Sequence, residues 1–200
     1  MDFWQRLVRR ASLKALGNLE KDETYSFLRE HALFRELSPP AFLFLHDCMI
    51  ERRYNRNEII FAEGTPGVCL FLVRTGRVEV FASHGAEPHA SRTIYCVASE
   101  RQIFGELSMV SMSYRTRSAK ALDPGTAILA LSLYDLKALE KQHPADALRV
   151  LKGITETMAH NLLDVSLRLR EVERDLTNSR AQSSRPASPA SESLPPASQG

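Results

Sequence analysis

Residues 104–119 read FGELSMVSMSYRTRSA, and this stretch carries the strongest signal in the chain for both fold and function. Gly105 precedes a helix-like run, and backbone N–H groups beside a glycine at a helix start can hold an anion. Arg115 opens a strand nine positions beyond Glu106 and can donate two hydrogen bonds to a phosphate. Glu106 only accepts hydrogen bonds when it is ionised, so it suits hydroxyl groups. An anion site beside a hydroxyl site predicts a phosphorylated ribose.

The same stretch resembles the phosphate-binding cassette of cyclic-nucleotide-binding domains, the sensor modules of catabolite activators, cAMP-dependent kinase regulatory subunits and cyclic-nucleotide-gated channels. The family pattern is roughly F-G-E-L-A, about six variable residues, and then R-[TSA]-A-[TS]-[VA]. It falls here on Phe104, Gly105, Glu106, Leu107, Ser108, Arg115, Thr116 and the residues that follow. The resemblance implies that Glu106 holds the ribose 2′-hydroxyl and that Arg115 holds the cyclic phosphate.

A second motif, EIIFAEGTPGVCLFLVRTGRVEV at 58–80, also resembles the family pattern and stands before the cassette, as it does in the family. Asn57 replaces the glycine with which this motif usually opens. Because asparagine tolerates a positive φ, we expect the turn to survive. The two motifs together extend the resemblance over about residues 33–177.

The rest of the pattern predicts an α+β fold, a β-roll or jelly-roll barrel of about eight short strands, flanked by N-terminal helices and a long C-terminal helix. Turn signals separate β-rich runs at 49–54, 58–62, 69–74, 77–83, 92–98, 116–122 and 126–132. Helical patterns occupy 2–17, 22–31 with Asp22 as the cap, a segment from Ser38, 134–142, and a segment that continues from Pro144 to Leu176.

These patterns divide the chain into four parts. They are an N-terminal helical segment at 1–32, the nucleotide-binding β-roll at 33–143, a capping and dimerisation helix at 144–178, and a disordered tail at 179–200. The tail consists mainly of Ser, Pro and Ala and cannot bury a core.

The long C-terminal helix carries apolar residues at alternating spacings of three and four, which is a heptad seam. The seam runs through Leu148, Leu151, Thr155, Met158, Leu162, Val165, Leu169, Val172 and Leu176. We expect its first half to pack on the roll and its second half to pair with the same helix of another chain, which makes a homodimer.

Three positions bear on the nucleotide base. The resemblance implies that Thr116, like threonine or serine at this place in members that accept cGMP, can bond the guanine 2-amino group, which permits cGMP without excluding cAMP. Aligning 158–159 with the long helix of the activators puts Ser166 near the base. Arg117 stands where the family usually has a small residue, and it is either a second cation near the phosphate or a solvent-facing side chain.

Composition narrows the function classes further. A net charge of +2 gives no global field for nucleic acid, and no apolar run is long enough to span a membrane, so neither DNA nor a membrane is an expected partner. Cys48, Cys69 and Cys96 lie in apolar segments and fit reduced thiols in the cytoplasm. The six histidines show no metal-ligand spacing, and no nucleophile or phosphate-loop motif appears. We therefore expect neither an enzyme nor a cofactor beyond a bound nucleotide.

The sequence thus predicts a cytoplasmic sensor of cAMP or cGMP that signals through its C-terminal helix, either to an unidentified effector protein or through dimerisation. The DNA-reading module of transcription factors in this family is not expected, because only the Ser/Pro/Ala tail follows the helix. The alternative is a β-roll that binds no ligand and serves as an interaction scaffold.

Overall fold

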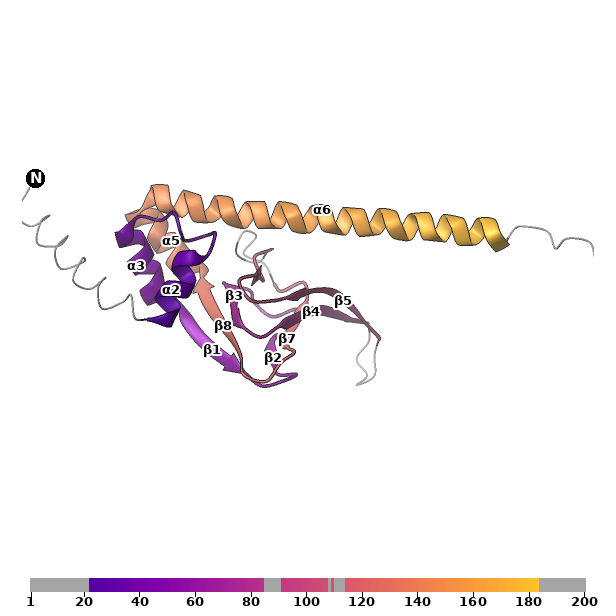
Figure 1. Cartoon of the computed structure of the whole chain (residues 1–200), viewed down its shortest axis with the longest axis horizontal. Coiled ribbons are helices and arrows are strands. Elements are labelled where there is room, and N and C mark those ends of the chain that lie inside the picture. Colours follow the sequence, from indigo (N-terminus) through magenta and orange to yellow (C-terminus); the bar gives the residue numbers. More distant parts are fainter. Residues whose placement is uncertain (1–21, 85–90, 108, 110–113, 184–200) are drawn as a thin grey trace, which may run out of the picture. The chain divides into compact units, whose positions relative to one another are not determined.

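The computed structural model describes residues 22–84, 91–107, 109 and 114–183 (Figure 1). The strands are β1 (Ile50–Tyr54), β2 (Ile59–Phe61), β3 (Cys69–Thr75), β4 (Val78–His84), β5 (Ser91–Ala98), β6 (Ile103–Phe104), β7 (Ser118–Ala121) and β8 (Thr126–Ser132). The helices are α2 (Glu23–Glu30), α3 (Pro39–Cys48), α5 (Leu133–Gln142) and α6 (Pro144–Ser183). The predicted N-terminal helix at 2–17 and most of the tail lie outside the described residues.

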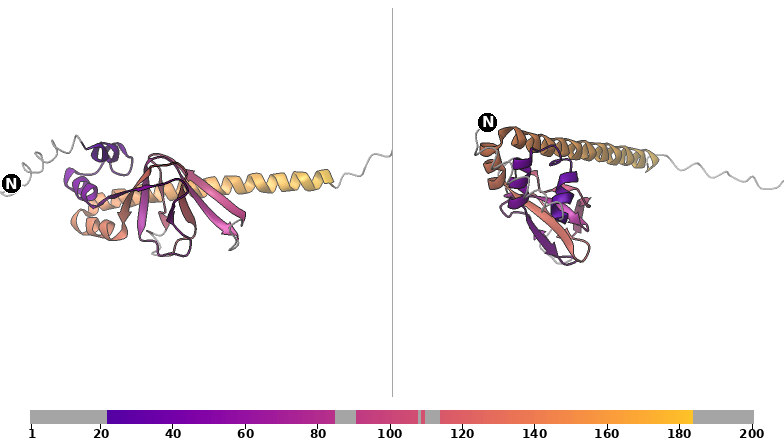
Figure 2. Two further views of the ribbon diagram at one scale, coloured as in Figure 1. Left: turned by 90° about the horizontal axis from the view of Figure 1, so that it is seen from below. Right: turned by 60° about the vertical axis from the view of Figure 1, so that its left-hand side comes forward.

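The strands form two antiparallel four-stranded sheets, with the orders β1-β8-β3-β6 and β2-β7-β4-β5. Figure 2 shows them wrapping into a roll, and Figure 1 shows α2, α3 and α5 beside one end of it. The predicted α+β fold, a β-roll with flanking helices, is therefore confirmed. The runs read from the sequence omitted β6, because a strand of two residues is too short to show alternation.

Local signals set several element boundaries as expected. Asp22 caps α2, since its side chain accepts a hydrogen bond from the Thr24 N–H at 2.8 Å. Asn57 has φ 65°, so asparagine does replace glycine at a left-handed position. Ser38 precedes α3 as predicted, but its side chain does not cap that helix. Its hydroxyl donates instead to Asp146 of α6 at 2.6 Å.

In the first turns of α6, the buried face of the helix differs from the face that the heptad pattern predicts. Ala147, Val150 and Ile154 are the buried residues, and they join a core formed by α2, α3, α5 and strands β3 and β8. Leu148 was predicted to pack on the roll, but it is 68% exposed. On a helix of 3.6 residues per turn, Leu148 lies roughly 130° away from the centre of the buried face. Leu151 and Met158 lie at the edge of that face and pack against the core.

A second, smaller core fills the roll with the inner residues of both sheets, including Val73, Val78, Ala119, Ala121 and Ile128. The compact unit that contains both cores ends at Met158, and a second unit begins at Ala159. In that second unit α6 continues to Ser183, past the predicted end, and its apolar side chains are exposed. None of the helices that the structure describes is long and apolar enough to cross a membrane.

Candidate functional site

Two stretches that are far apart in the sequence meet at the main chain of Arg115. Its N–H donates to the Thr65 carbonyl at 2.8 Å, and its carbonyl accepts from the Gly64 N–H at 2.8 Å. Pro66 and Tyr114 form an isolated bridge beside these bonds. The turn that the sequence predicted at 64–67 therefore fixes the backbone of Arg115. Since these two bonds involve only main-chain atoms, they do not depend on what the side chain binds.

The Arg115 side chain is buried, with 6% of its residue surface exposed, and points toward the glycine of the cassette. Its Nη1 donates to the Gly105 carbonyl at 2.9 Å, and its Nη2 donates to the Cys69 carbonyl at 2.7 Å. A guanidinium has five N–H donors in one plane, so these two bonds fix the orientation of that plane. The positively charged guanidinium of Arg115 is thus held in one orientation.

Three phenylalanines form an aromatic surface beneath that guanidinium. The rings of Phe61, Phe71 and Phe104 stack on one another, with centroids 5.3–6.1 Å apart. The Arg115 Cζ lies 4.2 Å from the Phe61 centroid and 5.2 Å from that of Phe71. Cation–π attraction of this kind stabilises a desolvated arginine. Phe61 and Phe71 were identified only as motif positions, and nothing in the sequence indicated that they would support Arg115.

Gly105 has φ +74°, and the space that a side chain would take is already filled. A Cβ at this position would lie 2.7 Å from Arg115 Nη1 and 3.3 Å from Phe71 Cδ2. The glycine therefore meets two requirements of this structure, a left-handed backbone and room for the arginine. The sequence predicted a different role for this glycine, beside backbone N–H groups that hold an anion.

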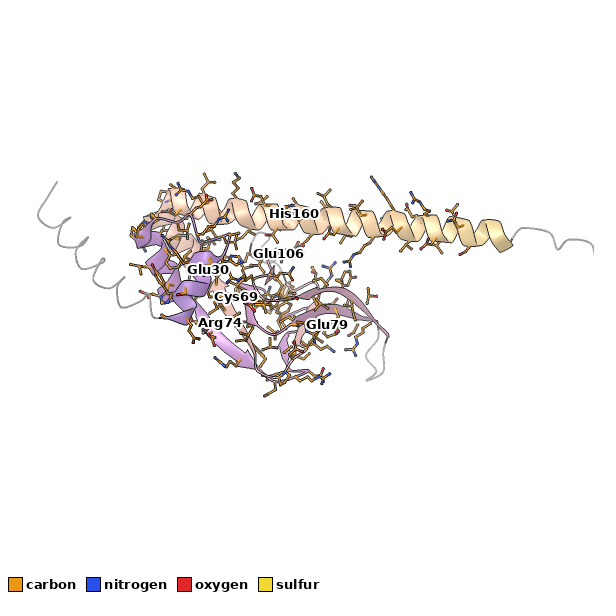
Figure 3. The ribbon with its side chains drawn as sticks, in the orientation of Figure 1. Glu30, Cys69, Arg74, Glu79, Glu106 and His160 are labelled. Atoms are coloured by element: carbon orange, nitrogen blue, oxygen red, sulfur yellow. The ribbon has the colours of Figure 1, made fainter. Side chains whose placement is uncertain are left out.

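The remaining cassette residues follow Gly105 directly. Glu106 is buried at 8% exposure, and its main-chain carbonyl accepts from the Met109 N–H at 3.0 Å, which starts a tight turn. Leu107 is 46% exposed, and Ser108 lies outside the described residues. Figure 3 labels Glu106 together with Cys69, whose carbonyl holds the arginine. The two side chains chosen from the sequence, Glu106 and Arg115, are therefore both buried in the first compact unit.

Arg115 is the cation of this cluster, and burial and neighbouring groups shift its pKa and that of Cys69. Burial lowers the pKa of Arg115, while electrostatic interactions with Cys69 and with the Glu106 carboxylate oppose that shift. Burial raises the pKa of the Cys69 thiol, and nearby Arg115 opposes it. Cys69 is therefore a neutral thiol at neutral pH, and an anionic ligand would meet the positive charge of Arg115.

The residues predicted near the base lie in different settings. Thr116 is exposed, and Arg117 is half buried with its Cζ 3.6 Å from the centroid of the Tyr95 ring. Arg117 is therefore not a purely solvent-facing side chain, and Tyr95 is a neighbour that the sequence reasoning missed. Ser166 is exposed in the second unit, where its hydroxyl donates to the Leu162 carbonyl at 2.9 Å. Its contact with the base stays a prediction.

The described part of the chain contains no group of three or more His, Cys, Asp or Glu side chains that could hold a metal ion. What it does contain is a fixed, desolvated guanidinium, a neighbouring carboxylate and a glycine turn, which are groups that bind an anion and a hydroxyl.

Comparison with known proteins identifies the family of the domain that contains these residues. Residues 51–143 match the family model of the cyclic nucleotide-binding domain. The chain contains a domain of this family. The match begins in β1 and ends just before α6, so it includes both sequence motifs and the residues described above that contact the Arg115 side chain.

Relatives of several kinds carry the cyclic nucleotide-binding domain. The cyclic AMP receptor protein of Thermus thermophilus is 31% identical over 147 residues, which are 72% of this chain and 60% of that protein. Human cGMP-dependent protein kinase 2 is 25% identical over 65% of this chain and 16% of the kinase. The crystal structure of a cyclic nucleotide-binding domain from Methylobacillus flagellatus superposes with a TM-score of 0.59 and 25% identity, covering 78% of this chain and 85% of that one. The chain thus spans less than two thirds of these two sequence relatives.

Proposed function

We propose that this protein is a sensor that binds cAMP or cGMP at the Arg115 cluster and has no enzymatic step of its own. The observation that carries the proposal is the Arg115 guanidinium, which two carbonyls and two aromatic rings hold in place beside Gly105 and Glu106. A fixed donor loses less conformational entropy on binding than a mobile side chain does. The printed names of the relatives, a cyclic AMP receptor and a cGMP-dependent kinase, support a cyclic nucleotide as the ligand class.

In this proposal each part of the ligand has its own partner. The cyclic phosphate binds the backbone amides of 105–108 and the Arg115 guanidinium. The Glu106 carboxylate accepts a hydrogen bond from the ribose 2′-hydroxyl. Thr116 and Ser166 lie near the base. Residues 33–143 form the binding domain, and 144–178 form the helix that responds to the ligand.

The proposed signal is a population shift of the C-terminal helix. The helix has two positions, and the ligand shifts the equilibrium between them only if it binds one of the two states more tightly than the other. The first turns of α6 belong to the core through Val150 and Ile154, so a change near the cassette can reach the helix through packed side chains. The exposed seam from Leu162 to Leu176 then pairs with a second copy or contacts an effector protein. The cytoplasmic location stays a prediction.

The test is calorimetry with cAMP and cGMP on the wild type, Arg115→Ala and the control Arg35→Ala. Arg35 has an exposed side chain that pairs only with the adjacent Glu36 among the described residues. Loss of charge-assisted bonds should weaken binding in Arg115→Ala by about 3 kcal/mol, or more than ~100-fold, and leave the control unchanged. Unchanged affinity in Arg115→Ala would refute the assignment. A wild type that neither nucleotide stabilises in a thermal-shift assay would favour the scaffold.

A further inference from the structure

Arg117 and Tyr95 form a stacked pair that the family pattern does not contain. The Arg117 Cζ is 3.6 Å from the centroid of the tyrosine ring. A separation of this size is typical of a guanidinium that lies roughly flat on an aromatic ring. A flat guanidinium keeps its N–H donors in its own plane, where stacking does not block them.

The register of β4 and β7 indicates the face on which Arg117 lies. Val80 pairs with Ala119, and Phe81 pairs with Ser118, where the ladder ends one residue after Arg117. Val80 and Ala119 both belong to the core inside the roll. Since side chains alternate along a strand, Ala82 shares that inner face, and the same alternation continued two residues back from Ala119 assigns Arg117 to it.

The contact between Arg117 and Tyr95 crosses β4, because β4 lies between β7 and β5 in the sheet. Tyr95 is the extra residue in the β4–β5 ladder, where the register shifts between Val80 and Phe81. Bulges of this kind redirect a side chain, and they occur frequently next to binding sites.

The pair is close to the phosphate-binding arginine along the chain. Arg115 and Arg117 are separated by the single exposed residue Thr116. A nucleotide whose phosphate lies on Arg115 therefore has its base within reach of the next inner-face arginine. Among the residues that the structure describes, no carboxylate forms an ion pair with Arg117.

We infer that Arg117, stacked on Tyr95, is a specificity residue that selects a guanine-type base at the proposed nucleotide site. Guanine presents two acceptors, O6 and N7, to which an arginine donates as a fork. Adenine presents N7 beside an amino group, which is itself a donor and cannot accept from the second N–H. This inference rests on the proposed function, which leaves cAMP and cGMP as alternative ligands, and it selects cGMP.

The test compares cGMP, cAMP and cyclic inosine monophosphate by calorimetry. The inosine compound keeps O6 and N7 but lacks the 2-amino group, so it reports on Arg117 without any contribution from Thr116. We expect the wild type to bind cGMP and the inosine compound more tightly than cAMP. Arg117→Ala should weaken both by about 5- to 150-fold and leave cAMP binding unchanged.

Two matched variants separate a base contact from other roles. Arg117→Lys keeps the charge and can still donate to O6 and N7, but it loses the planar fork and its stacking on Tyr95, so it should show a weaker guanine preference than the wild type. Tyr95→Phe keeps the ring and should retain the preference, whereas Tyr95→Leu should lose it. Circular-dichroism melting of each variant establishes that it is folded.

Three results would overturn the inference. They are a wild type that binds the three nucleotides equally, an Arg117→Lys variant with wild-type selectivity, and an Arg117→Ala variant that weakens all three nucleotides to the same extent. The second result would mean that the planar fork does not make the selection, and the third would indicate a cation for phosphate. A wild type that binds none of the nucleotides would overturn the proposed function as well, whereas binding without selectivity overturns this inference alone.

Discussion

Replacing Gly105 with alanine tests whether the glycine exists to make room for Arg115. The new Cβ would lie 2.7 Å from Arg115 Nη1, so the guanidinium must leave the Gly105 carbonyl. An L-residue at φ +74° costs about 1–2 kcal/mol, and a lost hydrogen bond from a charged group costs about 1.5–3 kcal/mol. Together they predict a loss of about 2.5–5 kcal/mol in the free energy of unfolding.

Gly125 provides a matched control for the backbone cost. It has φ +71°, and a Cβ there would meet nothing within 4 Å. Gly125→Ala should therefore lose only the backbone cost of about 1–2 kcal/mol. The difference between the two variants isolates the displacement of Arg115.

Urea unfolding measures the stabilities, and calorimetry with cAMP and cGMP measures binding. Gly105→Ala should bind at least ~10-fold more weakly than Gly125→Ala, because its guanidinium no longer points along the preset direction. Equal stabilities together with equal affinities in the two variants would refute the reasoning. That result would mean that Arg115 moves aside at no cost.

Two further predictions concern the histidine at the end of α2 and the exposed seam of α6. The buried His31 ring accepts from the Leu33 N–H at Nδ1 and contacts the Arg101 carbonyl at 2.9 Å through Nε2, and burial lowers its pKa below 6.5. The unfolded chain therefore binds this proton first, so stability is retained above the unfolded pKa and falls as the pH drops below it, by up to about 1.4 kcal/mol per pH unit. His31→Gln should flatten urea stability curves between about pH 7 and 5, and curves parallel to the wild type would contradict this account. Leu169→Glu, on the exposed seam, should convert a dimer to a monomer in sedimentation experiments, whereas Leu163→Glu, equally exposed but off the seam, should not. A monomeric wild type would contradict dimerisation through this helix.

The sequence by itself was enough to identify the elements and the cassette. Turn residues and alternating apolar residues encode strands locally, which is why seven of the strands follow runs visible in the chain. The cap at Asp22 and the left-handed turn at Asn57 are also local properties. Glu106 and Arg115 were identified because their spacing matches a family motif, and the family is confirmed.

Only the tertiary structure determined which side chains meet. The Ser38 hydroxyl binds Asp146, which is far away in the sequence, and Arg115 binds the Cys69 carbonyl across the roll. The buried face of α6 follows Val150 rather than Leu148, because what the helix packs against is set by α2, α3 and α5. Arg117 lies over the ring of Tyr95, which stands at the register shift between β4 and β5. Local sequence sets backbone preference within a few residues, whereas side-chain partners depend on close packing between distant segments.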